Sequence, residues 1–408
     1  MTRHSNHPAR RGITLIEILF AIGIVVIGVF GIMAILLLAG ARARQAIDAS
    51  QVAASGRQAI GQIAVRGWQR ADMVLLLTPS TGWQPLSAVV AWRQNPATVA
   101  QFRQVFLDGR ISYCLDPLLV ARSLASSQPM RVGSPESRFP YRSPPSRQAP
   151  YPPMMLTMPR ATVTTTVGVV QPIPPAIAER TTTLLDDLKF DAPADRTLLP
   201  RQVFDRIIPG GPALRRANHG NFSWFATVTP GLDMTGISDD GEPTRLDYVL
   251  SVVVLKDRVP PYRTSTGAVV ESERQVQVER LLGNGHGGGT VSLIGQSAAE
   301  LAVRRGNWVM LSGICLVPYV PPPGSAPGAG GAPQRIGFHT WYRVIGRTDP
   351  VRDTTLSAPN QWRRQLTLEG PDWPLSRIVP GTMWLTIVDN AVSVSSKTFR
   401  FEPTSGSW

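Results

Sequence analysis

The distribution of apolar and polar residues divides the chain into an N-terminal part that favours a helix and a longer part that favours strands. Ile18 to Ala41 is a run of 24 residues without a charge, which as a helix would be about 36 Å long. A hydrocarbon core is about 30 Å thick, so the run predicts a transmembrane helix at about 18–41. Residues 42–70 lack Pro and are rich in Ala, Gln and Arg, so we expect the helix to continue. Gly67 or Pro79 should end it.

Beyond residue 70 the periodicity changes to two, which is typical of half-buried strands. Gly, Pro and Asp turns separate the alternating segments. The predicted fold class is α+β, with a long N-terminal transmembrane helix followed by a large, mainly antiparallel β ectodomain that carries Pro- and Gly-rich loops. The segments predicted as strands are 221–229, 247–256, 273–281, 307–311, 338–345, 365–368 and 382–388.

Two Pro-rich segments interrupt the strand pattern. Residues 128–159 combine Pro with Ser and Arg, and residues 321–333 (PPPGSAPGAGGAP) are of low complexity. Both compositions predict exposed loops or linkers. Strands flank the second segment closely, so it is either an insertion within one sheet or a boundary between two domains.

One carboxylate, Glu17, lies beside the apolar run. An acidic residue at the centre of a spanning helix costs about 2.5 to 3.5 kcal/mol, less toward the end, so Glu17 needs a partner or access to the interface. A cleaved secretory signal would have an apolar core of about 7 to 15 residues, which is shorter than this one. A permanent signal anchor stays open, because arginines lie on both sides of the run and the positive-inside rule gives no orientation.

The flank of this run carries a family resemblance. A basic leader, MTRHSNHPARR, ends in Gly12 and is followed at once by Ile-Thr-Leu-Ile-Glu. Residues 8–45 resemble the leader and cleavage site of type IV prepilins and pseudopilins, which carry Phe more often than Ile at the position of Ile13. The resemblance implies that prepilin peptidase cuts after Gly12 and that the new amine of Ile13 is methylated. Glu17 is then the fifth residue of the mature chain, where the family carries a glutamate that meets the terminal amine of a neighbouring subunit.

The resemblance also implies partners, a location and a division of the chain. The expected partners are prepilin peptidase, other pilin or pseudopilin subunits, an inner-membrane assembly platform and membrane lipid. The expected location is the inner (cytoplasmic) membrane, crossed once with the head on the periplasmic side, and then a pilus or pseudopilus filament. The expected division is a leader peptide at 1–12, an N-terminal helix at 13–70, a β-rich head at 71–320, a low-complexity loop or linker at 321–336 and a C-terminal β segment at 337–408.

Charge adds little to this prediction. The net charge is +13, which suggests attraction to nucleic acid or anionic surfaces. Of the 41 basic residues, however, only Lys189, Lys256 and Lys397 are lysines, and GC-rich codon usage explains that bias more simply. No dense basic run is interleaved with aromatic residues, so DNA is not an expected partner.

Glycine and histidine patterns predict no catalysis. Gly283-Asn-Gly285-His-Gly287-Gly288 has the spacing of a dinucleotide-binding loop, but that loop must lead into a helix. Residues 290–294 read as a strand instead, so we expect a hairpin. His219, His286 and His339 are scattered and are expected at the surface or in turns. We expect no enzyme activity and no cofactor.

Acidic residues gather in one loop that also contains glycines. Flexible oxygen-rich loops suit Ca²⁺, but the spacing here is not that of an EF-hand. An ordinary acidic turn is therefore expected, and the residues are only weak candidates for a metal site. They are Asp233, Asp239, Asp240 and Glu242.

Cys114 and Cys315 are the two cysteines of the chain. An exported, oxidising compartment would favour a disulfide between them, and a loop of about 200 residues would gain roughly 5 kcal/mol in the chain-entropy model. Both also lie in apolar segments, RISYCLDP and LSGICLVP, which suit two separately buried thiols. The sequence leaves both alternatives open.

These observations predict a non-enzymatic assembly subunit, a minor type IV pilin or pseudopilin of a type IV pilus or a type II secretion pseudopilus. The helix sequence GIVVIGVFGIMAIL is similar to those of minor pilins of the pilus-modification type and of minor pseudopilins, without separating them. One alternative is a membrane-anchored exported enzyme or binding module with an uncleaved signal anchor. Another is a DNA-uptake pilin.

Overall fold

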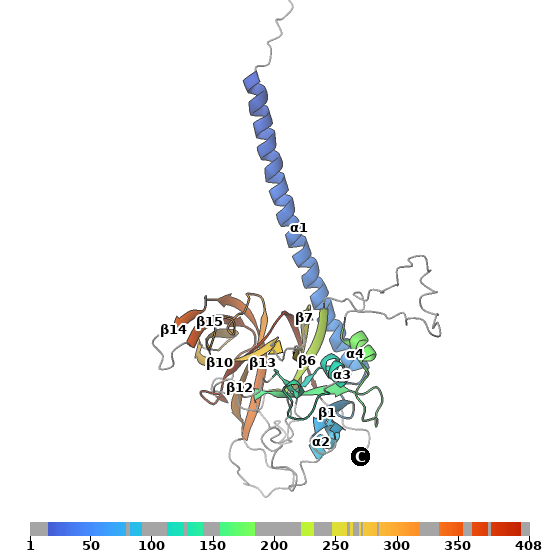
Figure 1. The fold of residues 1–408 in the computed structure, drawn as a ribbon. Coiled ribbons are helices and arrows are strands. Elements are labelled where there is room, and N and C mark those ends of the chain that lie inside the picture. The colour runs from blue at the N-terminus through green and yellow to red at the C-terminus, as the bar shows by residue number, and fades with distance from the viewer. Residues whose placement is uncertain are drawn as a thin grey trace, which may run out of the picture. The chain divides into compact units, whose positions relative to one another are not determined.

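The computed structural model describes most of the chain in separate ranges, which are 15–78, 82–91, 112–125, 129–141, 156–183, 222–231, 247–258, 262–263, 269–270, 272–283, 285–317, 334–353, 361–373 and 377–400. The helices are α1 Leu15–Val65, α2 Leu86–Ala91, α3 Pro117–Leu124 and α4 Pro175–Thr182, with a 3-10 turn η3 at Pro135–Ser137. The first strands are β1 Val74–Thr78, β2 Gly82–Pro85, β3 Tyr113–Leu115, β4 Arg138–Phe139, β5 Met158–Val163, β6 Phe222–Pro230, β7 Asp247–Lys256, β8 Tyr262–Arg263 and β9 Val269–Val270. The remaining strands are β10 Glu273–Leu282, β11 Gly288–Gly295, β12 Trp308–Val317, β13 Gln334–Arg347, β14 Val351–Asp353, β15 Gln361–Glu369, β16 Trp384–Val388 and β17 Ala391–Arg400 (Figure 1).

Helix α1 ends at Val65, just before Gly67, which is one of the two ends that the sequence predicts. Contacts between residues divide the chain into two compact units, Met1–Gln51 and Val52–Trp408. The C-terminal end of α1 belongs to the second unit. Gly67 has a φ of 69°, a left-handed conformation that glycine adopts without steric cost. The N–H of Gly67 donates to the carbonyl of Ala64 at 3.1 Å, and the N–H of Trp68 donates to that of Ile63 at 2.9 Å. This pattern of a Schellman cap satisfies the last carbonyls of the helix.

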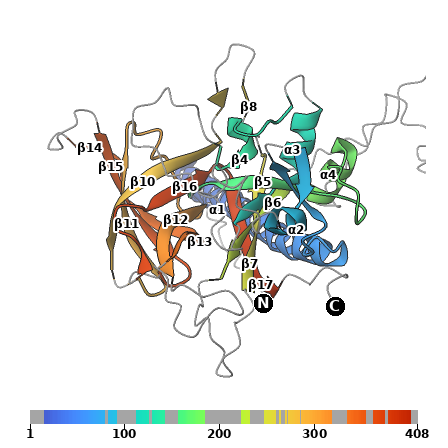
Figure 2. The ribbon, with the colours of Figure 1, turned by 90° about the horizontal axis from the view of Figure 1, so that it is seen from below.

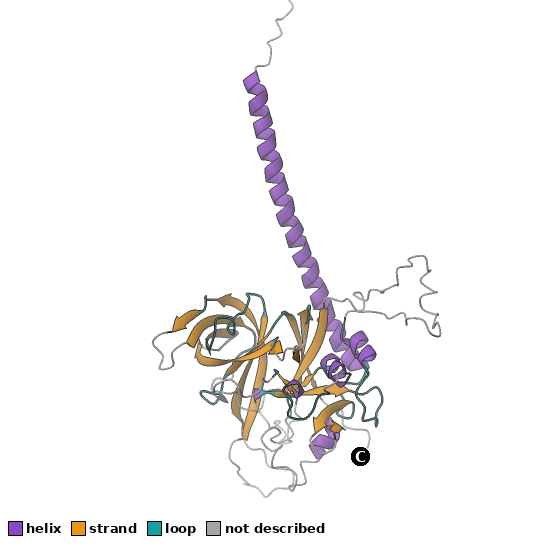
Figure 3. Cartoon of the chain, in the orientation of Figure 1, coloured by secondary structure: helices purple, strands orange, loops and turns teal. Residues whose placement is uncertain are grey.

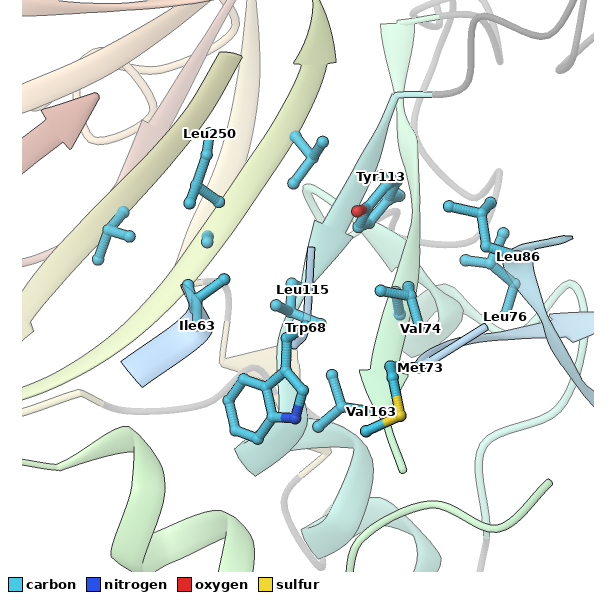
Figure 4. Packing of buried hydrophobic residues seen from close by; sticks show 14 of the residues in the cluster. Ile63, Trp68, Met73, Val74, Leu76, Leu86, Tyr113, Leu115, Val163 and Leu250 are labelled. Carbon is cyan, nitrogen blue, oxygen red and sulfur yellow. The ribbon is translucent and has the colours of Figure 1, made fainter. Parts of the chain in front are cut away.

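The first large sheet has the order β17-β7-β6-β3-β5-β1-β2, with β4 paired to β5. Its strand pairs are antiparallel except β3 with β5. The last turns of α1 cover an apolar cluster of this sheet, to which Ile63, Trp68, Leu115 and Val163 belong. Figure 4 shows these side chains gathered between the end of the helix and the strands.

The second large sheet has the order β11-β10-β16-β12-β13-β15-β14. It closes on itself, because β11 pairs with β15 as well as with β10 (Figure 2). Its interior is apolar and contains Leu293, Val309 and Leu366, all fully buried. Leu301 and Val303, from the segment between β11 and β12, belong to the same core. That segment therefore covers part of the interior.

Each segment predicted as a strand forms one. Strands β6, β7, β10, β12, β13, β15 and β16 contain or overlap the predicted ranges. The hairpin expected around Gly285 is also present, since β10 and β11 pair antiparallel across it. The predictions were reliable here because alternation of apolar residues is a local property of the chain.

The predicted α+β class is wrong, because strand is the commonest structure among the described residues and builds two large sheets (Figure 3). Much of the first sheet comes from short strands that are too brief to show a period of two. Strands β4 and β5 lie within or at the end of the Pro-rich segment 128–159, which was expected to be an exposed loop. Phe139 and Met158 of this segment are fully buried.

The predicted membrane span is wrong as well. Across the parts of the chain that the structure describes, no helix combines the length and the apolarity that a bilayer crossing requires. The expected single-pass location in the inner membrane is therefore not supported. The prediction rested on a count of uncharged residues along the sequence.

Candidate assembly surface

The N-terminal part of α1 exposes large apolar side chains on every side. Ile24, Val25, Val26 and Ile27 are exposed by 44% to 74%, and successive helical residues point in directions about 100° apart. This part of α1 is therefore not amphipathic. A helix that is apolar all round is normally buried against other apolar groups. The exposed side chains of this surface, which we call the apolar helix surface, are those of Leu15, Ile16, Ile18, Leu19, Phe20, Ile22, Ile24, Val25, Val26, Ile27, Val29, Phe30, Ile32, Met33, Ile35 and Leu36.

The residues of the predicted processing site lie at or before the start of α1. Gly12 and Ile13 lie outside the described residues. Glu17 belongs to α1, three positions into the helix as described. Cleavage, methylation and the role of Glu17 therefore stay predictions.

The weak metal candidates Asp233, Asp239, Asp240 and Glu242 also lie outside the described residues. Elsewhere in the described ranges, no three His, Cys, Asp or Glu side chains come together as metal ligands would. His286 is exposed in the hairpin after β10, with its Nδ1 3.2 Å from Asp372 Oδ2. His339 is buried in β13, so the expectation that it lies at the surface or in a turn is wrong.

Both cysteines are free and buried. Cys114 of β3 and Cys315 of β12 belong to different apolar clusters. Burial raises the pKa of the Cys114 thiol well above its ordinary value, and burial raises that of Cys315 to about 11. Both thiols are thus held in their unreactive protonated form.

A buried cluster of four charges joins the two large sheets. Arg160 of β5 donates to Asp116 Oδ2 at 2.6 Å and also to Glu273 of β10. Arg258 donates to Asp116 Oδ1 at 2.9 Å, and the N–H of Tyr141 donates to Glu273 Oε2 at 2.9 Å. The two positive and two negative charges balance within the cluster. Such a cluster is destabilised by about 3 to 5 kcal/mol when one partner is removed, because an unpaired charge stays buried.

Electrostatics within the cluster explains the state of Asp116. Burial by itself would raise the pKa of its carboxyl, but the neighbouring Arg258 and Arg160 hold the pKa below its ordinary value. Asp116 Oδ1 also accepts from the N–H of Leu119, which caps helix α3. This cluster was not predicted from the sequence. Two signals were available: Asp116 precedes Pro117, which is typical of a helix start, and Arg160 stands in an otherwise apolar strand.

A second contact between the sheets is a hydrogen bond from Trp341 Nε1 of β13 to Thr227 Oγ1 of β6, 2.9 Å long. Phe139, Phe225 and Trp341 pack around it with ring centroids 5.0 to 6.4 Å apart. Polar groups of both sheets are thus satisfied inside a shared apolar cluster, which fixes the register between them.

Comparison with known proteins gives no relative: no family model, no curated protein and no solved structure matches this chain.

Proposed function

We propose that this chain is a structural assembly subunit of a type IV pilus or pseudopilus filament, matured by prepilin peptidase. The observation that carries the proposal is the apolar helix surface, which is exposed on all sides of α1. Packing against the equivalent helices of other pilin or pseudopilin subunits would remove that surface from water, at a gain of about 25 cal/mol per Å².

The residues before the helix support the same proposal. A cut after Gly12 creates a new amine on Ile13, four positions before Glu17. In a helix bundle, the Glu17 carboxylate of one subunit pairs with the terminal amine of the next. Such a pair is far stronger in a low dielectric than in water, and an unpaired charge there is costly. Glu17 therefore favours recruitment in one axial register.

The test is made on filaments sheared from cells that express the full chain. Intact mass should show loss of residues 1–12 and one added methyl group. Glu17→Ala should be cut normally, since it lies beyond the cleavage site, but its amount in the filament fraction should fall about tenfold or more. Glu369→Ala, which removes an exposed carboxylate at the end of β15, is the matched control and should be incorporated like the wild type.

Two results would contradict the proposal. One is a chain in the cell that still begins at Met1. The other is incorporation of Glu17→Ala equal to that of Glu369→Ala, which would mean that the carboxylate has no part in assembly.

A further inference from the structure

A cleft of about 980 Å³ lies in the unit Val52–Trp408. One wall is the turn between β16 and β17 together with the end of β7, and the other is the segment 297–307. Side chains from three strands of the closed sheet reach it, namely Arg274 of β10, Arg347 of β13 and Arg364 of β15. The cleft thus lies where that segment covers the interior of the second sheet.

Backbone carbonyls hold the three arginines in place. Arg364 Nη1 donates to the carbonyl of Leu301 at 2.7 Å, and Arg347 Nη1 donates to that of Val303 at 3.1 Å. Arg274 Nε donates to the carbonyl of Glu300 at 2.9 Å. Carbonyl groups orient a guanidinium but do not neutralise its charge, so these bonds leave positive charge in the cleft.

Arg364 is the most unusual of the three. Its exposed fraction is 3%, and its Nη2 atom is buried without a hydrogen-bond partner. A buried donor left unpaired costs about 1 to 3 kcal/mol. Burial lowers the pKa of Arg364, as does the nearby charge of Arg347, while Asp349 raises it. A guanidinium nevertheless stays charged at any ordinary pH, so the wall of the cleft contains an unsatisfied cationic donor.

Three carboxylates, those of Asp257, Glu300 and Asp389, line the cleft against five basic side chains. Asp389 Oδ1 accepts from Arg274 at 2.7 Å, and Glu300 Oε2 accepts from the N–H of Gln296 at 2.7 Å. Among the described residues, neither Arg347 nor Arg364 forms an ion pair with a carboxylate. Lys256 and the exposed Arg304 add further positive charge to the lining.

We propose that this cleft binds a small anionic ligand through a carboxylate or phosphate group, held by Arg364, Arg347 and Arg304. The planar guanidinium matches both groups with paired hydrogen bonds. The volume lies within the range of small-molecule sites. This inference goes beyond filament assembly and does not depend on it.

The test is calorimetric titration of the full chain with pyrophosphate and, separately, with citrate, at low and at physiological salt. The wild type should bind at least one of these anions, and more weakly at the higher salt. Arg364→Gln should weaken binding about tenfold or more, because a charge-assisted hydrogen bond is lost. Arg304→Gln should weaken it several-fold. Arg305→Gln is the matched control, since Arg305 is exposed beside the cleft but does not line it, and it should bind within about twofold of wild type.

Thermal unfolding of each variant without ligand shows whether Arg364→Gln is folded. If it is not, the proposal is tested by comparing the anion affinity of Arg304→Gln with that of Arg305→Gln. Absence of binding to both anions at millimolar concentration would overturn the proposal. So would an equal loss in Arg304→Gln and Arg305→Gln, which would indicate attraction to surface charge alone. Displacement of pyrophosphate by a DNA oligonucleotide at equal phosphate concentration would overturn the assignment to a small ligand.

Discussion

His339 is buried in β13, with its Nδ1 2.9 Å from Ser312 Oγ. Burial lowers its pKa to about 3, and the charge of Arg138 acts in the same direction. In the unfolded chain the pKa of a histidine is about 6.5. Protonation of His339 is therefore less favourable in the folded state than in the unfolded state. The contribution of His339 to stability is complete above about pH 6.5 and is lost as the pH falls toward 3.

We expect the free energy of unfolding to fall by about 2 kcal/mol between pH 7 and pH 5 because of His339. Denaturant unfolding at the two pH values measures it. His339→Gln should reduce this difference, whereas His286→Gln should keep it, because His286 is exposed. Asp116 does not affect this difference, because its pKa is lowered. Its contribution to the free energy of unfolding is lost only below about pH 4. An unchanged difference in His339→Gln would refute the prediction.

At the scale of elements, the end of α1 meets β17 closely at one glycine. A Cβ on Gly56 would lie 2.4 Å from Ser395 Oγ and 3.1 Å from Ser395 Cβ. Val52, one turn earlier, packs with Phe222 and Val254. A larger residue at position 56 would therefore push the helix away from the sheet.

Gly56→Leu should lower the free energy of unfolding by about 1 to 3 kcal/mol, the usual cost of overpacking. Gly61 lies on the same helix with nothing within 4 Å of its Cβ position. Gly61→Leu should therefore be neutral or stabilising by up to about 1 kcal/mol, since glycine is a poor helix former. Denaturant unfolding of both variants gives the comparison. Equal effects would show that helix propensity, not contact with β17, governs position 56.

At the scale of the whole molecule, the size of the unit Val52–Trp408 bears on the proposed function. Its two large sheets are joined by the buried charges of Asp116, Arg160, Arg258 and Glu273, so it should act as one body. A filament of a single pilin must place its heads side by side around a narrow bundle of helices. A head with two sheets of this size would crowd that arrangement, except at a filament end.

On the proposed function, we expect sheared filaments to contain this chain in a few copies for many copies of a much smaller pilin. Quantitative mass spectrometry of the filament fraction measures the ratio, and the amount of the Glu17→Ala variant gives the background of unassembled chain. A filament in which this chain is the most abundant subunit would overturn the assignment to a minor subunit.

The sequence by itself determined the features that depend on neighbours along the chain. Alternation of apolar residues located β6 and β7 almost to the residue. Gly67 was one of two predicted ends of α1, and the helix ends there because glycine takes the left-handed conformation that completes the cap. The strand after Gly288 distinguished a hairpin from a dinucleotide loop. The pattern around Gly12 and Ile13 is likewise local, and it supports the functional proposal.

Tertiary structure alone decided the features that depend on which distant segments become neighbours. Strands β3 and β4, with three and two residues, are too short to reveal themselves by periodicity. Strand β5 has six residues but is buried along nearly its whole length, so its sequence does not alternate. The pairing of Arg160 with Glu273 joins positions 113 residues apart, and no local pattern predicts it. The two cysteines are free, and each is buried in a different apolar cluster. Arg364 is charged wherever it lies, but its burial and its unsatisfied Nη2 donor arise because β15 places it against the segment 297–307.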